Sequence, residues 1–141
     1  MCWVVYLAAD VPLPEVPWSE DRPAFNVTRI PRPESPVARQ FSKLHLHRIG
    51  AHTGCGCGFD RTQVNERHPR ELTDTQQSLR ELRAYLGQVV IAAGPVELFA
   101  CWDDDQEKPP AHRVSLTLRD FTANMRWLPE GTFATVETGA A

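Results

Sequence analysis

The stretch 54–59 holds the residues best suited to chemistry, with the sequence Gly-Cys-Gly-Cys-Gly-Phe. Its two thiols are two positions apart, and a glycine stands on both sides of each. Glycine has no side chain and reaches left-handed backbone conformations at little cost, so it leaves neighbouring sulfur atoms and N–H groups accessible. The pattern predicts a thiol-centred site, and two further cysteines, Cys2 and Cys101, are available to join it.

A zinc site is the first interpretation of these cysteines. Zinc is usually held in a tetrahedron by thiolates and imidazoles. The candidate ligands are Cys55, Cys57, Cys101 and either Cys2 or His52. Their number fits zinc, but Cys55 and Cys57 are closer together than the roughly two to four intervening residues of common zinc motifs. This interpretation predicts a metal-binding protein.

A reversible dithiol is the second interpretation. In an extended backbone the Cα atoms of Cys55 and Cys57 lie about 6.6 Å apart, near the upper limit for a disulfide. A bend at the glycines brings them closer, and strained, exposed disulfides are typically the redox-active ones. Cys55 and Cys57 would then be the catalytic residues, with His52 lowering a thiol pKa.

A non-catalytic interaction or structural protein is the third interpretation. Free cysteine is among the most buried residue types, so the four thiols can simply be small core residues. The binding surface would then be a sheet face or the proline-rich segment 11–40. The chain has no phosphate loop, no His-Glu-x-x-His and no Gly-x-Ser-x-Gly, so no motif assigns an enzyme class or another cofactor.

The elements that must position the cysteines are those of an α+β protein. An uncharged, β-branched and aromatic run at 2–9 predicts a central buried strand. Residues 73–92 predict the main helix, with Thr73 and Gln76 as a capping box and an apolar stripe facing the sheet. The other predicted strands are 43–49, 96–102 and 113–118, and the stretches 125–128 and 132–136 are candidates for a last short hairpin. We expect a single mixed sheet of four to five strands with the helix packed on one face.

Residues 11–40 hold seven of the chain's twelve prolines. Proline removes an N–H donor and restricts the residue before it, so we expect an irregular segment. Trp18 and Phe25 would pin this segment over a hydrophobic face. At 141 residues the chain fits one domain, residues 1–141, that includes the proline-rich cover.

Strand direction decides whether the cysteines meet. Strands 43–49 and 96–102 are joined by the helix, so we expect them to be parallel and to end at one edge of the sheet. An antiparallel first strand would begin at that edge and place all four cysteines there. Strand 96–102 alternates, with Cys101 facing away from Trp102. Strands 96–102 and 113–118 should form an antiparallel hairpin with Val114 inward.

Composition excludes some classes of protein. Fifteen basic against eighteen acidic residues give a net charge of −3, which argues against a nucleic-acid partner. The longest apolar runs are far shorter than the roughly 20 residues that cross a bilayer, so we expect no membrane partner. No secretory signal is visible, which predicts a cytoplasmic protein with reduced thiols. A homo-oligomer is compatible with the sequence.

The segment Arg48–Phe59 and the cysteine-containing first strand resemble a group of small uncharacterised bacterial proteins. These proteins share a hydrophobic N-terminal strand and a Gly-Cys-x-Cys-Gly-Phe turn, so the resemblance covers mainly residues 2–8 and 49–59. It implies a bacterial protein that stands alone. The group has no assigned activity, so the resemblance transfers no catalytic residue.

Overall fold

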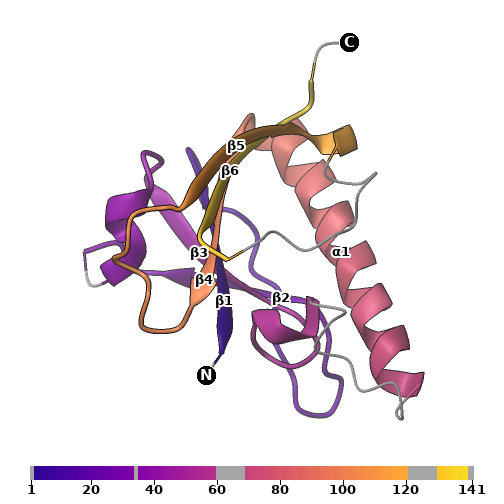
Figure 1. The fold of residues 1–141 in the computed structure, drawn as a ribbon. Coiled ribbons are helices and arrows are strands. Elements are labelled where there is room, and N and C mark those ends of the chain that lie inside the picture. The colour runs from indigo at the N-terminus through magenta and orange to yellow at the C-terminus, as the bar shows by residue number, and fades with distance from the viewer. Residues whose placement is uncertain (1, 34, 60–68, 121–129, 140–141) are drawn as a thin grey trace.

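The computed structural model describes residues 2–33, 35–59, 69–120 and 130–139. They form one open, mixed, six-stranded sheet with one main helix, α1, against it (Figure 1). The strands are β1 (Trp3–Ala9), β2 (Asn26–Ile30), β3 (His45–Gly50), β4 (Val96–Trp102), β5 (His112–Thr117) and β6 (Thr132–Glu137). The predicted α+β class and mixed sheet are confirmed, but the sheet has six strands rather than four to five.

β1 is the centre of the sheet, whose order is β2-β3-β1-β4-β6-β5. All seven of its residues are buried, as an uncharged strand covered on both faces should be. It runs antiparallel to both β3 and β4, so those two strands point the same way. The expected parallel direction of β3 and β4 is therefore confirmed, and the first strand, whose direction the sequence left open, is antiparallel to both.

The helix α1 (Pro69–Ala93) covers one face of the sheet. Leu82, Leu86 and Val90 on its apolar stripe are buried against Val5 and its neighbours in β1. The helix begins four residues earlier than Thr73, so the predicted capping box is wrong. Proline is well suited to the first helical position, where no N–H is needed, and this explains the earlier start.

A second core lies on the opposite face of the sheet. It contains alternate residues of β1 and β4 together with Phe133 of β6. Phe41 and Val37 cover this face, and Val37 belongs to the 3₁₀ helix η1 (Pro36–Gln40). Among the described residues, both sheet faces are thus packed, one by α1 and the other by the chain around η1.

The proline-rich segment is more regular than predicted. It contains β2, which pairs with β3, as well as η1. Prolines flank β2 at Pro23 and Pro31 but none lies within it, and as an edge strand it needs a partner on one side only. The expected pinning is found at Phe25, which is buried, and at Trp18, whose indole N–H donates to the His52 carbonyl.

The predicted hairpin between β4 and β5 is wrong. β6 lies between them, antiparallel to β4 and parallel to β5. Burial of the apolar side chains agrees with this order, because Phe133, Ala134 and Val136 of β6 are buried whereas Val114 of β5 is 39% exposed. The predicted strand 125–128 lies outside the described residues, and the strand predicted at 132–136 is β6.

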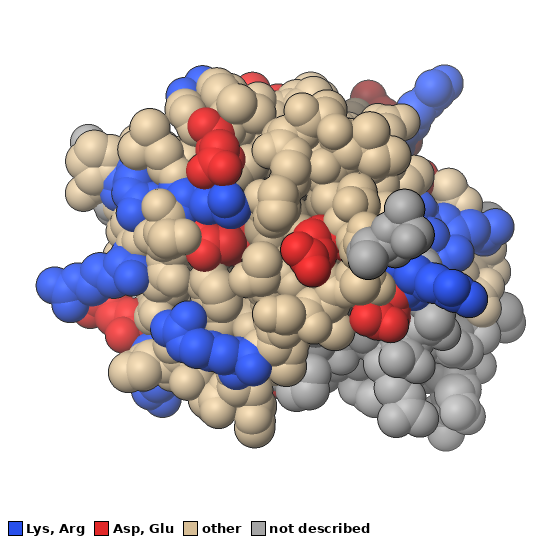
Figure 2. Space-filling model, turned by 90° about the horizontal axis from the view of Figure 1, so that it is seen from above, with Lys and Arg blue, Asp and Glu red and all other residues tan. Residues whose placement is uncertain are grey.

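Charged side chains are mixed by sign on the face shown in Figure 2, where basic and acidic groups stand interspersed among uncharged residues. Within the described parts of the chain, no helix combines the length and the apolar composition that a membrane span requires.

Candidate metal centre

Three of the four cysteines meet at one end of the sheet. The Sγ atoms of Cys2, Cys55 and Cys57 all lie within 4.8 Å of one another. Cys2 directly precedes β1, and the other two follow β3. Because β1 and β3 are antiparallel, the start of one strand lies beside the end of the other, and this brings residues more than fifty positions apart into one group. We call these three residues the cysteine group.

The loop that carries Cys55 and Cys57 is shaped by glycine. Gly54 has φ of 85°, a left-handed conformation that favours glycine, and its N–H donates to the Ala51 carbonyl. The Ala51 N–H in turn donates to the Cys55 carbonyl at 2.9 Å, which closes the turn. At Gly56 a Cβ atom would lie 2.8 Å from the Trp3 carbonyl oxygen. The loop can therefore reach β1 only with glycine at this position.

The 3₁₀ helix η2 (Gly56–Phe59) places Cys57 against the start of β1. The N–H of Trp3 donates to the Cys57 Sγ at 3.2 Å, and the Thr53 Oγ1 lies 3.7 Å from the Cys55 Sγ. Backbone and hydroxyl groups of the fold thus point toward two of the three sulfur atoms. Hydrogen bonds of this kind stabilise a thiolate.

The thiols of Cys55 and Cys57 differ in acidity. Burial raises the pKa of Cys55, but hydrogen bonds from the Cys57 N–H, Thr53 and the neighbouring thiols outweigh it, so this pKa lies below its ordinary value. Burial raises the pKa of Cys57, and the sulfur atoms of Cys55 and Cys2 raise it further, whereas the Trp3 N–H lowers it. Cys55 is therefore the thiol that loses its proton first of these two.

Cys101 lies near the same end of the sheet as Cys2, as expected, but on the opposite face, so it does not join the cysteine group. It is 2% exposed in the core opposite α1, where its cross-strand partner is Val4. The residue also lines a cavity of about 260 Å³ between Phe99 and the loop 105–111. Burial, followed by the nearby carboxylates of which Asp105 is the strongest, raises the pKa of Cys101 to about 12. Within the described chain, Cys101 is not one of the three clustered sulfur ligands.

His52 lies in the loop before Cys55 but forms its hydrogen bonds with the helix α1. Its Nδ1 and its backbone N–H both lie 3.0 Å from the Ser78 Oγ of α1. Its ring nitrogens are not among the ligand atoms that cluster with the three sulfurs in the described residues. In this structure His52 anchors the loop to the helix.

Two residues of the site were not anticipated from the sequence. Thr53 bonds to the Cys55 carbonyl and accepts from the Gly58 N–H, so its hydroxyl organises the loop. A threonine two residues before a cysteine, in a turn rich in glycine, is the signal that predicts such a bond. No sequence pattern predicts the bond from the Trp3 N–H, because this backbone donor reaches the Cys57 sulfur only when the strand and the loop have packed together.

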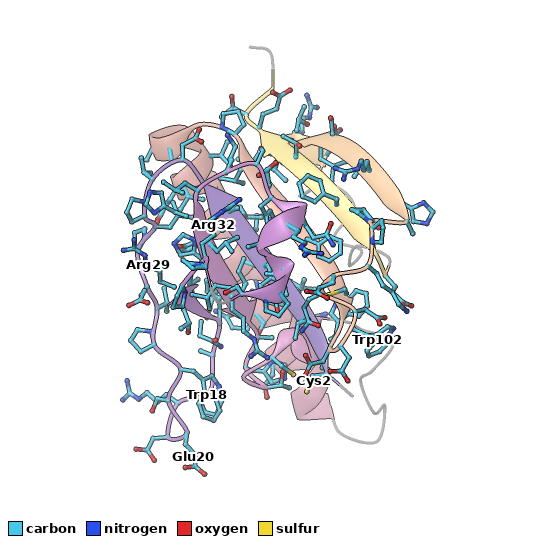
Figure 3. The ribbon with its side chains drawn as sticks, turned by 90° about the vertical axis from the view of Figure 1, so that its left-hand side faces the viewer. Cys2, Trp18, Glu20, Arg29, Arg32 and Trp102 are labelled. Atoms are coloured by element: carbon cyan, nitrogen blue, oxygen red, sulfur yellow. The ribbon has the colours of Figure 1, made fainter. Side chains whose placement is uncertain are left out.

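Three sulfur atoms in this arrangement can bind one soft metal ion. In a tetrahedral zinc site with Zn–S distances of about 2.3 Å, two sulfurs lie about 3.8 Å apart. The observed upper limit of 4.8 Å therefore requires a contraction of about 1 Å or less, which side-chain rotation can supply. Figure 3 shows Cys2 at the end of the molecule where Trp18 and Trp102 also lie.

Comparison of the chain with models of protein families, with curated proteins and with solved structures finds no match.

Proposed function

We propose that this protein binds one zinc ion per chain through the thiolates of Cys2, Cys55 and Cys57. The observation that carries the proposal is the mutual distance of their three sulfur atoms, all within 4.8 Å although the residues come from two distant parts of the chain. Thiolates are the soft ligands that favour zinc over hard cations. Three thiolates with a fourth ligand of another kind complete a tetrahedral zinc shell.

The hydrogen bonds at the site support this proposal. A thiol must lose its proton to bind a metal, and the lowered pKa of Cys55 reduces the cost of that step. Burial leaves the pKa of a second ligand, Cys57, above its ordinary value, but the Trp3 N–H at its Sγ opposes this rise and also fixes the orientation of the thiol. Such bonds to a ligand atom commonly change metal affinity by about 10- to 100-fold.

Elemental analysis after anaerobic purification tests the proposal. We expect close to one zinc ion per chain, and a loss of affinity for Cys55→Ser and Cys57→Ser that exceeds the roughly 100-fold effect of removing a hydrogen bond to a metal ligand. Cys101→Ala is the matched control, because it removes a thiol that lies in the opposite core. A wild-type chain without affinity for zinc, or equal losses in the Cys101 control, would contradict the proposal.

A dithiol redox protein is the second candidate. The observation that favours it is the difference between Cys55 and Cys57, whose pKa values are shifted in opposite directions. The Cys55 thiolate would attack a disulfide of the oxidant and release one of its sulfurs as a thiol. Cys57 would then displace the other sulfur from the mixed disulfide, which leaves a Cys55–Cys57 disulfide and the oxidant reduced to two thiols. This candidate predicts a reversible loss of two thiols per chain under mild oxidant, unchanged in Cys2→Ser. If the loss of two thiols requires Cys2, then Cys55 and Cys57 are not the redox pair.

Both candidates fit a reducing compartment such as the cytoplasm, where exposed thiols stay free. The resemblance to small bacterial proteins remains a prediction, as does the absence of a nucleic-acid partner.

A further inference from the structure

Residues 11–18, which we call the strap, connect the end of β1 to the neighbourhood of the cysteine loop. Leu13 is the only residue of the strap that is buried. The strap is held by bonds to several elements. They are Leu13 N–H to the His47 ring, the Tyr85 hydroxyl to the Pro14 carbonyl, the Arg29 N–H to Glu15, two backbone bonds between Val16 and Val27, and the Trp18 indole to the His52 carbonyl.

His47 is the least ordinary of these anchors. Its ring is wholly buried in β3, and its Nε2 accepts the Leu13 N–H at 3.1 Å. Since Nε2 accepts, the proton of the neutral ring is on Nδ1, which lies 3.3 Å from the Leu7 carbonyl oxygen. The neutral imidazole thus satisfies one donor and one acceptor of the backbone at once.

We propose that the strap is a clamp released by acid: a proton on His47 ends its bond to Leu13 and frees residues 11–18, with Trp18, from the cysteine loop. A protonated Nε2–H would face the Leu13 N–H, so two donors would oppose each other in a buried site. The clamp is independent of what the three thiols bind, because no bond of the strap involves a sulfur atom in the described structure.

The charges around His47 also favour its neutral form. Burial lowers the pKa of His47, the bond to the Leu7 carbonyl raises it, Arg29 and His45 lower it, and Glu15 raises it. These three charged or titratable groups belong to β2, to β3 and to the strap. In the released state the ring is solvated and its pKa returns toward about 6.5. Release therefore takes up a proton, and the clamped state loses stability as the pH falls below that value.

Release of the strap is more favourable than unfolding of the chain as a route to accommodate the proton. Apart from Leu13, the strap is exposed or half-buried, whereas β1 beside it is buried throughout. Segments with few buried contacts open at lower free energy than core strands. We therefore expect acid to open the strap while the sheet remains folded.

Trp18 connects this opening to the cysteine loop. Its indole lies 3.7–3.9 Å from the position of a Cβ on Gly54, the residue before Cys55, and it donates to the His52 carbonyl in the same loop. Figure 3 places Trp18 and Cys2 at the same end of the molecule. When the strap leaves, this side of the loop loses its cover and Cys55 becomes more accessible to reagents.

Amide hydrogen exchange between pH 8 and pH 5 tests the proposal, after correction for the pH dependence of the intrinsic exchange rate. We expect the Leu13 amide to lose protection by up to about tenfold per pH unit, as one linked proton requires, while the Val5 amide in β1 keeps its protection. A Leu13 amide whose protection is unchanged, or one that opens only together with Val5, would overturn the proposal.

A pair of glutamine variants sharpens this test. In His47→Gln the side-chain oxygen can accept the Leu13 N–H but does not titrate, so the acid-dependent loss should disappear. His45→Gln is the matched control on the same strand and should retain the loss, because His45 makes no bond to the strap. If His47→Gln does not fold, the wild-type protein still tests the proposal through the different pH dependence of amide protection at Leu13 and at Val5.

Discussion

The cysteine group and Cys101 show how one residue type acquires two chemical characters on a single sheet. Cys55 is half-buried, and its pKa is lowered by N–H and hydroxyl donors that outweigh the effect of burial. Cys101 is almost completely buried, and the pKa of its thiol is raised to about 12. The difference is in the donors: a turn leaves N–H groups free for a sulfur atom, whereas a central strand uses them in the sheet.

The same difference applies to the surrounding charges. The groups that raise the pKa of Cys101, after burial, are the carboxylates of Asp105, Asp103 and Glu130. Around Cys55 the hydrogen-bonding partners are backbone, hydroxyl and thiol groups. Chemical function therefore follows from the position of a cysteine in the fold, and the spacing of cysteines in the sequence is only part of the information.

Alkylation rates should separate the two kinds of thiol most strongly. At pH 7 a thiol of pKa about 12 is ionised about 10³-fold less than an ordinary one, and its greater nucleophilicity recovers only about 10- to 30-fold. We expect Cys55 to react with iodoacetamide at least about 30-fold faster than Cys101 in the metal-free folded chain. Peptide mass spectrometry measures both rates. Equal rates in the folded protein would contradict the different environments assigned to Cys55 and Cys101.

Stability should show the next largest difference. Cys101→Ser places a hydroxyl at a position that is almost completely buried in the core opposite α1, and we expect a loss of about 1–3 kcal/mol in the free energy of unfolding. Cys2→Ser is the matched control, since Cys2 is exposed, and should change the metal-free protein by less than about 0.5 kcal/mol. Urea denaturation with unchanged m-values measures both. A Cys2 variant as unstable as the Cys101 variant would argue against the assigned environments.

The close approach of the cysteine loop to β1 gives a third test. Gly56→Ala brings a methyl group 2.8 Å from both the Trp3 carbonyl oxygen and a Val5 methyl, and we expect destabilisation of about 1–3 kcal/mol with weaker zinc binding. Gly87→Ala in α1 is the control. Its new Cβ would lie 3.7 Å from Leu118, and it should stabilise the helix by about 0.5–1 kcal/mol. If both variants bind zinc like the wild type, the loop does not need its contact with β1.

Thr53 should have the smallest effect. Thr53→Val keeps the shape of the side chain but removes the hydroxyl near the Cys55 sulfur, so the pKa of Cys55 should rise. We expect its alkylation at pH 7 to slow by a few-fold, on the order of one hydrogen bond. The pH dependence of the Cys55 rate measures the shift directly. A rate profile that does not move would show that Thr53 only shapes the loop.

Local patterns in the sequence predicted much of the fold. The uncharged run in β1 indicated a central strand, the stripe of α1 indicated a helix on the sheet, and the antiparallel first strand explained how Cys2 reaches the cysteine loop. The order of β4, β6 and β5 was not predictable, because it depends on which of two apolar strands is better buried. The strand β2 was not predicted, because it lies in a segment rich in proline, although Pro23 and Pro31 stand just outside the strand itself.

The position of Cys101 was partly encoded. Neighbouring residues of β4 point to opposite faces of the sheet, so Cys101 and Trp102 lie on different faces. This alternation already separates Cys101 from the residues that face α1. Both faces of this strand are apolar, so the pattern does not indicate which face lies near the cysteine loop. Contacts between distant segments, such as the Trp3 N–H at the Cys57 sulfur, follow from the complete fold and have no local signal.

X-ray absorption at the zinc edge tests the central claim most directly. The sample is the reduced full-length chain loaded anaerobically with one equivalent of zinc. If Cys2, Cys55 and Cys57 bind the ion together, the first shell contains about three sulfur atoms at about 2.3 Å, and Cys101→Ala leaves this shell unchanged. A shell made only of nitrogen and oxygen at about 2.0–2.2 Å would contradict a thiolate site at this end of the sheet.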